Sequence, residues 1–288
     1  RGHQGTVWSA AYSADGRRIV SAGADGTLRQ WEATSGRAIG EPLRGHQGWV
    51  WSAAYSADGS RIVSAGGDGT LRQWEATSGR AIGEPLRGHQ GTVWSAAYSA
   101  DGRRIVSAGA DGTLRQWQAT SGRAIGEPLR GHQGWVWSAA YSADGRRIVS
   151  AGADGTLRQW EATSGRAIGE PLRGHQRWVL SAAYSADGSR IVSAGDDGTL
   201  RQWQATSGRA IGEPLRGLQG GVRSAAYSTD GSRIVSAGDD GTVRQWLPAW
   251  SDPIRLVCRS LRAHQSLLSP STEIEQEARN TCQRWGWR

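Results

Sequence analysis

Along the chain, short segments that contain apolar residues alternate with polar turns that contain glycine. The first unit of this pattern holds four such segments: VWSAAYS, RIVSAGA, TLRQWEA and RAIGEPL. Between them, Asp15-Gly16, Asp25-Gly26 and Ser35-Gly36 each predict a two-residue hairpin turn, because glycine accepts the positive φ that such turns need. Each unit therefore predicts four antiparallel strands.

The pattern repeats with a fixed period of 43 residues. The motif RGHQ or a variant of it starts at Arg1, Arg44, Arg87, Arg130, Arg173 and Arg216, so six units cover residues 1–258. Pro42 lies in the fourth segment, which indicates an edge strand, because proline is excluded from central strands. Several such sheets packed around an axis bury a shared core that one sheet cannot bury alone. The sequence predicts an all-β propeller with one four-stranded blade per unit.

The end of the chain does not repeat. Its segment IRLVCRSL, from Ile254, is expected to supply the outer strand of the sixth blade, and Thr272 with Glu275 predicts a short helix through about Gln283. We therefore expect a propeller domain over residues 1–262 and a tail over residues 263–288. With that strand, six blades can close a ring; without it, they are part of a larger one.

Composition and charge narrow the functional classes. The net charge is +8, but a typical unit carries five arginines and four carboxylates spread along its length, so we do not expect a nucleic-acid partner. No segment has the apolar length of a membrane span and the N-terminus has no signal-peptide core, which favours a cytoplasmic protein. Cys258 and Cys282 are expected to be reduced thiols, with a disulfide in the tail as the alternative.

Three motifs in each unit resemble the WD-repeat family. They are RGH near the start, YSADG after the first segment and DGTLRQW at the end of the third, and the match extends from residue 1 to about 246. The family's Trp-Asp dipeptide is Trp-Glu or Trp-Gln here, and Trp-Leu in the last unit. The resemblance implies a β-propeller that acts as a protein-interaction scaffold.

The same resemblance implies a buried hydrogen-bonded tetrad in each blade, which holds the blade in one register. The implied sets are His3, Ser21, Asp25 and Trp31; His46, Ser64, Asp68 and Trp74; His89, Ser107, Asp111 and Trp117; His132, Ser150, Asp154 and Trp160; and His175, Ser193, Asp197 and Trp203. The sixth unit has Leu218 in place of the histidine, so we expect its blade to be the weakest. Gln30 and its copies share a strand face with Leu28, and a buried amide there needs partners that the sequence does not identify.

Serine, histidine and aspartate could also form a catalytic triad. Five near-identical copies argue against this, because catalysis needs one constellation in one cleft, whereas every blade needs the same structural device. Histidines on separate blades do not converge on one metal ion, and the glycine-rich turns do not have the spacing of a phosphate-binding loop. We therefore expect no catalytic residue, no metal and no cofactor.

Differences between the units concentrate at positions six, eight and twenty-four. Alternation along a strand places positions six and eight on the same side of the first strand, and in WD-repeat proteins these positions line the rim of the narrow face, which commonly binds partners. Tryptophan at such positions is typical of interface anchors. The predicted partner-binding rim consists of Thr6, Trp8, Trp49, Trp51, Trp94, Trp135, Trp137, Trp178, Asp196, Arg223 and Asp239.

The near-identity of the units and the GRAIGEPLRGH linkers resemble the sensor propellers of bacterial and fungal NACHT or STAND-type signalling proteins. That resemblance implies a non-catalytic domain that recognises a protein ligand, covalently linked to an upstream NTPase or effector domain that this sequence lacks. One alternative is a multivalent carbohydrate-binding propeller, in which sugars stack on indoles between blades. Another is a purely architectural module, in which the rim differences are neutral.

Overall fold

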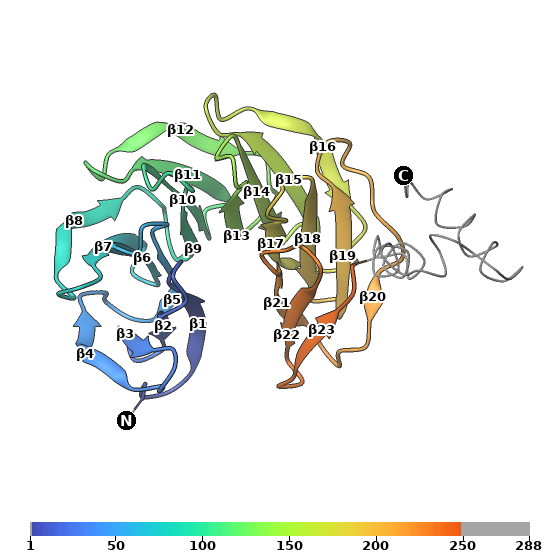
Figure 1. The fold of residues 1–288 in the computed structure, drawn as a ribbon. Helices are drawn as coiled ribbons and strands as arrows, with labels where there is room; N and C mark the ends of the chain where they lie inside the picture. Colours follow the sequence, from blue (N-terminus) through green and yellow to red (C-terminus); the bar gives the residue numbers. More distant parts are fainter. Residues whose placement is uncertain (1, 249–288) are drawn as a thin grey trace, which may run out of the picture.

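The structure is a computed structural model that describes residues 2–248, and these residues form six antiparallel sheets, one per repeat (Figure 1). The first blade contains β1 (Val7–Tyr12), β2 (Arg18–Gly23), β3 (Thr27–Glu32) and β4 (Ala38–Arg44). In each sheet the strands are hydrogen-bonded in sequence order. The predicted all-β propeller of six antiparallel blades is confirmed.

The other blades repeat this meander. The second, third and fourth blades consist of β5 (Val50–Tyr55), β6 (Arg61–Gly66), β7 (Thr70–Glu75) and β8 (Ala81–Arg87); β9 (Val93–Tyr98), β10 (Arg104–Gly109), β11 (Thr113–Gln118) and β12 (Ala124–Arg130); and β13 (Val136–Tyr141), β14 (Arg147–Gly152), β15 (Thr156–Glu161) and β16 (Ala167–Arg173). The fifth and sixth consist of β17 (Val179–Tyr184), β18 (Arg190–Gly195), β19 (Thr199–Gln204) and β20 (Leu215–Arg216); and β21 (Val222–Tyr227), β22 (Ile234–Gly238) and β23 (Val243–Trp246).

The turns are longer than the predicted two residues. Gly16, Gly26 and Gly36 have φ of 68°, 74° and 66°, as predicted, but three to five residues separate the strands that these turns connect. Side chains explain the added length in the β1–β2 turn: Ser13 Oγ donates to Asp15 Oδ1 at 2.6 Å, and the Arg17 amide donates to the same oxygen at 3.0 Å. These bonds stabilise a wider turn than backbone bonds alone would favour.

The outer strand of blade five departs from the prediction. It carries the same RAIGEPL sequence as blades one to four, yet only Leu215–Arg216 and an isolated bridge between Trp203 and Ala210 pair with β19. Since the sequence is identical, the difference arises from the neighbouring blade. In earlier junctions the β3–β4-type turn of the next blade packs on this strand, as Gly79 does on Leu43. The corresponding turn of the sixth unit, the predicted strand from Ile254, the tail helix and both cysteines lie outside the described residues.

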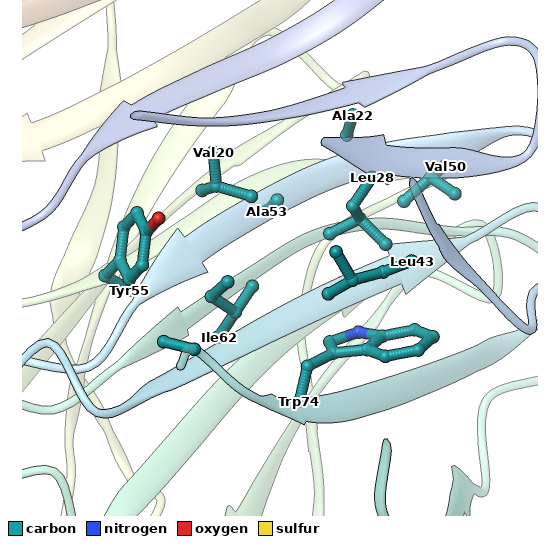
Figure 2. Close-up of a cluster of buried hydrophobic side chains, with 10 residues drawn as sticks. Val20, Ala22, Leu28, Leu43, Val50, Ala53, Tyr55, Ile62 and Trp74 are labelled. Atoms are coloured by element: carbon teal, nitrogen blue, oxygen red, sulfur yellow. The ribbon is translucent and has the colours of Figure 1, made fainter. Parts of the chain in front are cut away.

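Apolar side chains fill each junction between blades. At the first junction Val20, Ala22, Leu28 and Leu43 of blade one face Val50, Ala53, Tyr55, Ile62 and Trp74 of blade two (Figure 2). Four further clusters of the same kind follow along the array. Since each blade covers one face of its neighbour, the core is continuous from the first blade to the sixth.

Glutamine side chains link the same junctions with hydrogen bonds. Gln30 Nε2 donates to the carbonyl of Ala76 at 2.9 Å, and Gln30 Oε1 accepts from the hydroxyl of Tyr55 at 2.8 Å. Copies at Gln73, Gln116 and Gln159 make the same two bonds to the next blade. These are the partners that the sequence left unidentified, and they explain why an amide is tolerated on a buried strand face.

The array is an open arc. Consecutive innermost strands pack on one another from β1 to β21, whereas Figure 1 shows the first and sixth blades apart. Val7 is 49% exposed although its copy Val50 is 0% exposed, and Tyr12 is 65% exposed where Tyr55 is 8% exposed. Within the described part of the chain, the first and last blades therefore each present one uncovered apolar face. No helix among these residues is long and apolar enough to cross a membrane.

Candidate functional site

One end of every blade carries the GH turn, residues 3–6 and their copies, beside the turn that holds Asp25 or its copy. We call this end the GH-turn face. In blade two, His46 Nδ1 lies 3.1 Å from Asp68 Oδ1 and His46 Nε2 lies 2.8 Å from Ser64 Oγ. The Trp74 indole N–H donates to Ser64 Oγ at 2.9 Å. The tetrad is thus a single chain of hydrogen bonds that runs from a central strand to the turn.

The structure brings the four implied residues together in all five blades that have the histidine. The corresponding His–Asp, His–Ser and Trp–Ser contacts occur in blades one, three, four and five, at 2.7 to 3.1 Å. The direction of donation follows from the tryptophan, which can only donate. The serine hydroxyl is then free to donate to Nε2, and Nδ1–H donates to the carboxylate.

The tetrad aspartates are strongly acidic. Burial raises the pKa of Asp68, but hydrogen bonds from His46, the Gln47 amide and Thr70 lower it more, so this pKa lies well below its usual range. The Gln47 amide donates to Oδ2 at 2.8 Å, which ties the GH turn directly to the carboxylate. An ionised aspartate therefore fixes the turns of the GH-turn face.

The tetrad serines have no access to a substrate. Ser64, Ser107, Ser150 and Ser193 are 0% exposed, and each hydroxyl is engaged by both its tryptophan and its histidine. A nucleophile must reach the atom that it attacks, which a buried hydroxyl cannot do. The geometry of these residues is structural.

The sixth blade retains part of the tetrad. Leu218 occupies the place of the imidazole and is 8% exposed, while Trp246 Nε1 still donates to Ser236 Oγ at 2.8 Å. Asp240 keeps the bond from the Gln219 amide at 3.0 Å. The same oxygen lies 3.7 Å from the Arg244 guanidinium, an ion pair that the described residues of other blades do not form at this position. The loss of the histidine thus exposes the aspartate to a new partner.

A Leu218→His variant is expected to stabilise the sixth blade. Ser236 and Asp240 already occupy the positions of the tetrad serine and aspartate, so the new imidazole could accept from Ser236 and donate to Asp240. Each net hydrogen bond should add about 1 kcal/mol to the stability of the blade. Hydrogen exchange of the β22 and β23 amides measures the local free energy of opening, and these amides should become more protected. Unchanged or weaker protection, beside unaltered exchange in blade three, would show that the leucine is the better residue there.

Seven indoles form a continuous ladder across the GH-turn face. The position-eight rings are in contact from blade to blade, tilted for Trp8 and Trp51 with centroids 4.5 Å apart and edge-to-face for Trp51 and Trp94 with centroids 4.6 Å apart. The series continues from Trp94 to Trp137 at 4.7 Å. The position-six rings lie against these, as Trp49 does against Trp8 and Trp51. The indole ladder comprises Trp8, Trp49, Trp51, Trp94, Trp135, Trp137 and Trp178.

Much of the ladder remains accessible. Trp8, Trp49, Trp135 and Trp178 are 42%, 49%, 43% and 45% exposed. Thr6, the small position-six residue of blade one, is also exposed. Contiguous exposed apolar surface of this kind is uncommon on soluble proteins and is typical of interaction sites.

The charged rim residues of blades five and six form two ion pairs. Arg223 Nε lies 2.5 Å from Asp239 Oδ1, and its Nη2 lies 3.0 Å from Oδ2, so this pair is bidentate. Arg177 Nη1 lies 3.3 Å from Asp196 Oδ2. Position twenty-four therefore varies together with positions five and eight. Where position twenty-four is aspartate, an arginine at position five or eight of the same unit pairs with it.

Two residues of this charged sector were missed in the sequence. Arg177 replaces a glycine that has φ of 107° and 105° at Gly48 and Gly134, and no residue other than glycine has positive φ in the described part of the chain. Gly221 lacks the side chain that position six carries elsewhere. A Cβ there would lie 2.9 Å from Asp239 Oδ2 and 3.0 Å from Asp196 Oδ1. Comparison of position five between units would have identified Arg177.

Two cavities open beside Arg177. One of about 520 Å³ lies between blades four and five and is lined by Asp154, Gln176 and Trp178, among others. The second, of about 480 Å³, lies between blades five and six against Asp196 and Leu218. The indole ladder thus continues into a polar, hollowed sector on the same face.

Comparison with known proteins agrees with the fold. The family model "WD domain, G-beta repeat" matches residues 1–32, 37–75, 80–118, 123–161, 166–204 and 212–246. A search of curated proteins finds no match to the chain. From the second onward, each matched segment begins with the outer strand of one blade and ends with the third strand of the next. The matched segments cover most of the chain, and the chain therefore belongs to the WD-repeat family of β-propellers.

Proposed function

We propose that the GH-turn face is a protein-binding surface and that the propeller is the ligand-recognition part of a larger cytoplasmic signalling receptor, linked to an NTPase or effector domain. Propellers of this family generally serve as non-catalytic protein-interaction scaffolds. The observation that carries the proposal is the indole ladder, in which four of seven tryptophans are 42–49% exposed. The exposed part of these side chains contributes no burial to the fold, whereas at an interface it supplies large, rigid contact area.

The arrangement of the indoles favours a single protein partner over repeated sugar sites. A sugar bound between blades would have to stack on an indole there, but neighbouring position-eight rings lie 4.5–4.7 Å apart in tilted or edge-on contact, which leaves no room for a sugar ring between them. The ladder also ends at Trp178, since position eight is Leu180 in blade five and Arg223 in blade six. The rim is therefore asymmetric, as a surface for one asymmetric partner would be.

Capture from a lysate of the source organism on the immobilised propeller tests the proposal. A triple variant with Trp49, Trp135 and Trp178 changed to Ala should lose the partner, at least about tenfold in affinity, because anchor residues at interfaces contribute more than 1.4 kcal/mol. The matched control changes Val235, Val243 and Leu247 to Ala. These residues are 41%, 71% and 53% exposed but lie on the last blade, away from the indole ladder, so binding should persist.

Two outcomes would contradict this function. If the tryptophan variant and the control retain the same proteins, the indole ladder is not the binding site. If the propeller retains glycans and no protein, and the tryptophan variant releases them, the carbohydrate-binding alternative is correct. Circular dichroism of both variants must first match the parent chain.

A further inference from the structure

The fold places arginines that are evenly spaced in the sequence at the same face of successive blades. A residue at one position of the repeat recurs at the same place in every blade, so even spacing along the chain becomes a ring in space. Arg44, at the end of β4, is paired with Thr27 directly after the turn that holds Asp25, which places it at the GH-turn face. Its copies are Arg87, Arg130, Arg173 and Arg216; all five are exposed, and their guanidinium groups have no carboxylate or carbonyl partner among the described residues.

A second arginine of each blade reaches the same face. The Arg72 guanidinium lies beside Gly45, the residue directly before the GH turn, where a Cβ would be 3.0 Å from Nη1. The Nε–H of Arg72 is buried without an acceptor, as are those of its copies Arg29, Arg115, Arg158 and Arg201. Unpartnered buried donors of this kind are rare in proteins and require an explanation.

Carboxylates do not balance these arginines in blades one to four. The GH-turn face of these blades contains only the tetrad aspartates, whose side chains are 9–11% exposed and already accept several hydrogen bonds. At the opposite face, exposed carboxylates such as Asp15 and Glu32 stand among the arginines. The exposed charge at the turns of this face is therefore positive, and the exposed carboxylates that follow along the outer strands, Glu41 and its copies, lie three residues before each arginine.

Blades five and six end this positive sector. Asp196 and Asp239 appear there at position twenty-four, and each is paired with an arginine of its own blade. An occupant that crosses the face would meet unpaired arginines and indoles over blades one to four and arginine–aspartate ion pairs over blades five and six. This difference in charge between the two sectors would fix its direction.

Resting on the proposed protein-binding function, we infer that the partner is an acidic protein segment with apolar side chains. Its carboxylates pair with the outer ring of arginines, Arg44 and its four copies, while its apolar side chains lie on the indole ladder inside that ring. Charge complementarity selects this class of partner, and the indoles add contact area that a uniformly charged chain cannot use. Neighbouring position-eight rings lie 4.5–4.7 Å apart, which leaves no room for a base of a single-stranded nucleic acid to insert between them.

The probe is a fluorescently labelled copolymer of glutamate and tyrosine, titrated with the whole chain and followed by anisotropy. Polyglutamate, polylysine and single-stranded poly(U) serve as comparison probes. One variant changes Arg44, Arg87, Arg130, Arg173 and Arg216 to Gln. The matched control changes Arg37, Arg80, Arg123, Arg166 and Arg209 to Gln, which removes the same charge from five exposed side chains at the opposite face.

The glutamate–tyrosine copolymer should bind more tightly than polyglutamate, and polylysine should not bind. The GH-turn variant should weaken binding of the copolymer by about tenfold or more, in a manner that depends on salt, whereas the control should change it less than about twofold. Equal loss in both variants, or no loss in either, would overturn the inference. Tighter binding of poly(U) through the same arginines would replace the protein partner with a nucleic acid.

The outcome also separates this inference from the proposed function. If the variant lacking Trp49, Trp135 and Trp178 loses a captured protein while the GH-turn arginine variant retains it, the indole ladder binds proteins and only the acidic character of the partner is wrong. If neither variant affects capture, the failure lies with the proposed function itself.

Discussion

A Gly66→Ala variant is expected to lose about 3 kcal/mol of unfolding free energy, although the change adds a single methyl group. A Cβ at Gly66 would lie 2.7 Å from Asp68 Oδ1 and closer still to the His46 ring. Neither group can move away without breaking the tetrad, because His46 also bonds Ser64. Overpacking a filled site costs about 1–3 kcal/mol, and a broken buried hydrogen bond adds to that cost. Urea denaturation measures the loss.

The adjacent residue provides the control. Gly67→Ala makes the same chemical change one residue later, but the nearest atom to its Cβ is the Trp49 carbonyl oxygen at 3.5 Å, an ordinary contact. Blades one, three and four already have alanine at this position. This variant should remain within about 0.5 kcal/mol of the parent chain. Similar losses in the two variants would mean that glycine is required here for chain flexibility and not for the space that the tetrad occupies.

Gln73→Leu is expected to cost about 2 kcal/mol at the junction of blades two and three. The substitution leaves the hydroxyl of Tyr98 without its acceptor at 2.9 Å, and the Ala119 carbonyl keeps only the longer contact from Arg61 at 3.4 Å. A buried polar group that loses its partner costs about 1–3 kcal/mol. The loss is measured by urea denaturation, with hydrogen exchange of β6 and β9 to locate it.

Gln245 is the matched control for this change. It is the copy of Gln73 in the sixth blade, but it is exposed, and its Oε1 accepts only from Arg233 at 3.4 Å. Gln245→Leu should therefore alter stability by less than about 0.5 kcal/mol. If both variants lose stability equally, glutamine stabilises its own strand and not the junction.

The repeat period and the turn residues were sufficient to predict the blades from the sequence. Gly16, Gly26 and Gly36 mark the turns because positive φ is a local requirement, and local requirements are visible in local sequence. The partners of Gln30 were not predictable in this way. They lie 25 and 46 residues away, at Tyr55 and Ala76, and only the packing of one blade on the next brings them together.

The candidate site was also predictable from the sequence only in part. Positions six and eight could be assigned to one side of the strand from alternation alone, and Trp49 and Trp51 are in contact. The pairing of Arg177 with Asp196 spans two turns, and its sequence signal, the loss of a glycine at position five, was overlooked. Even spacing of arginines along the chain does not by itself show how they are placed in space, because a repeat protein converts periodicity along the chain into recurrence at one place in every blade.

The incomplete pairing of the outer strand of blade five could not be predicted from the pattern of the repeat. Residues identical to those of blades one to four pair with the neighbouring strand only at Leu215–Arg216 and at one bridge. A pattern within the unit cannot predict this difference, because the segment itself is identical in the five blades.

The glutamine links have a consequence for how the protein can change over generations. Each link runs forward, from one blade to the next, and its three participants occupy the same positions in successive repeats. Any blade from one to four can thus follow any other without creating a mismatched junction. Unequal recombination between near-identical repeats would delete or insert a whole unit and leave every remaining junction chemically intact. The number of blades, and with it the length of the indole ladder, is therefore a heritable variable that selection can change in single steps.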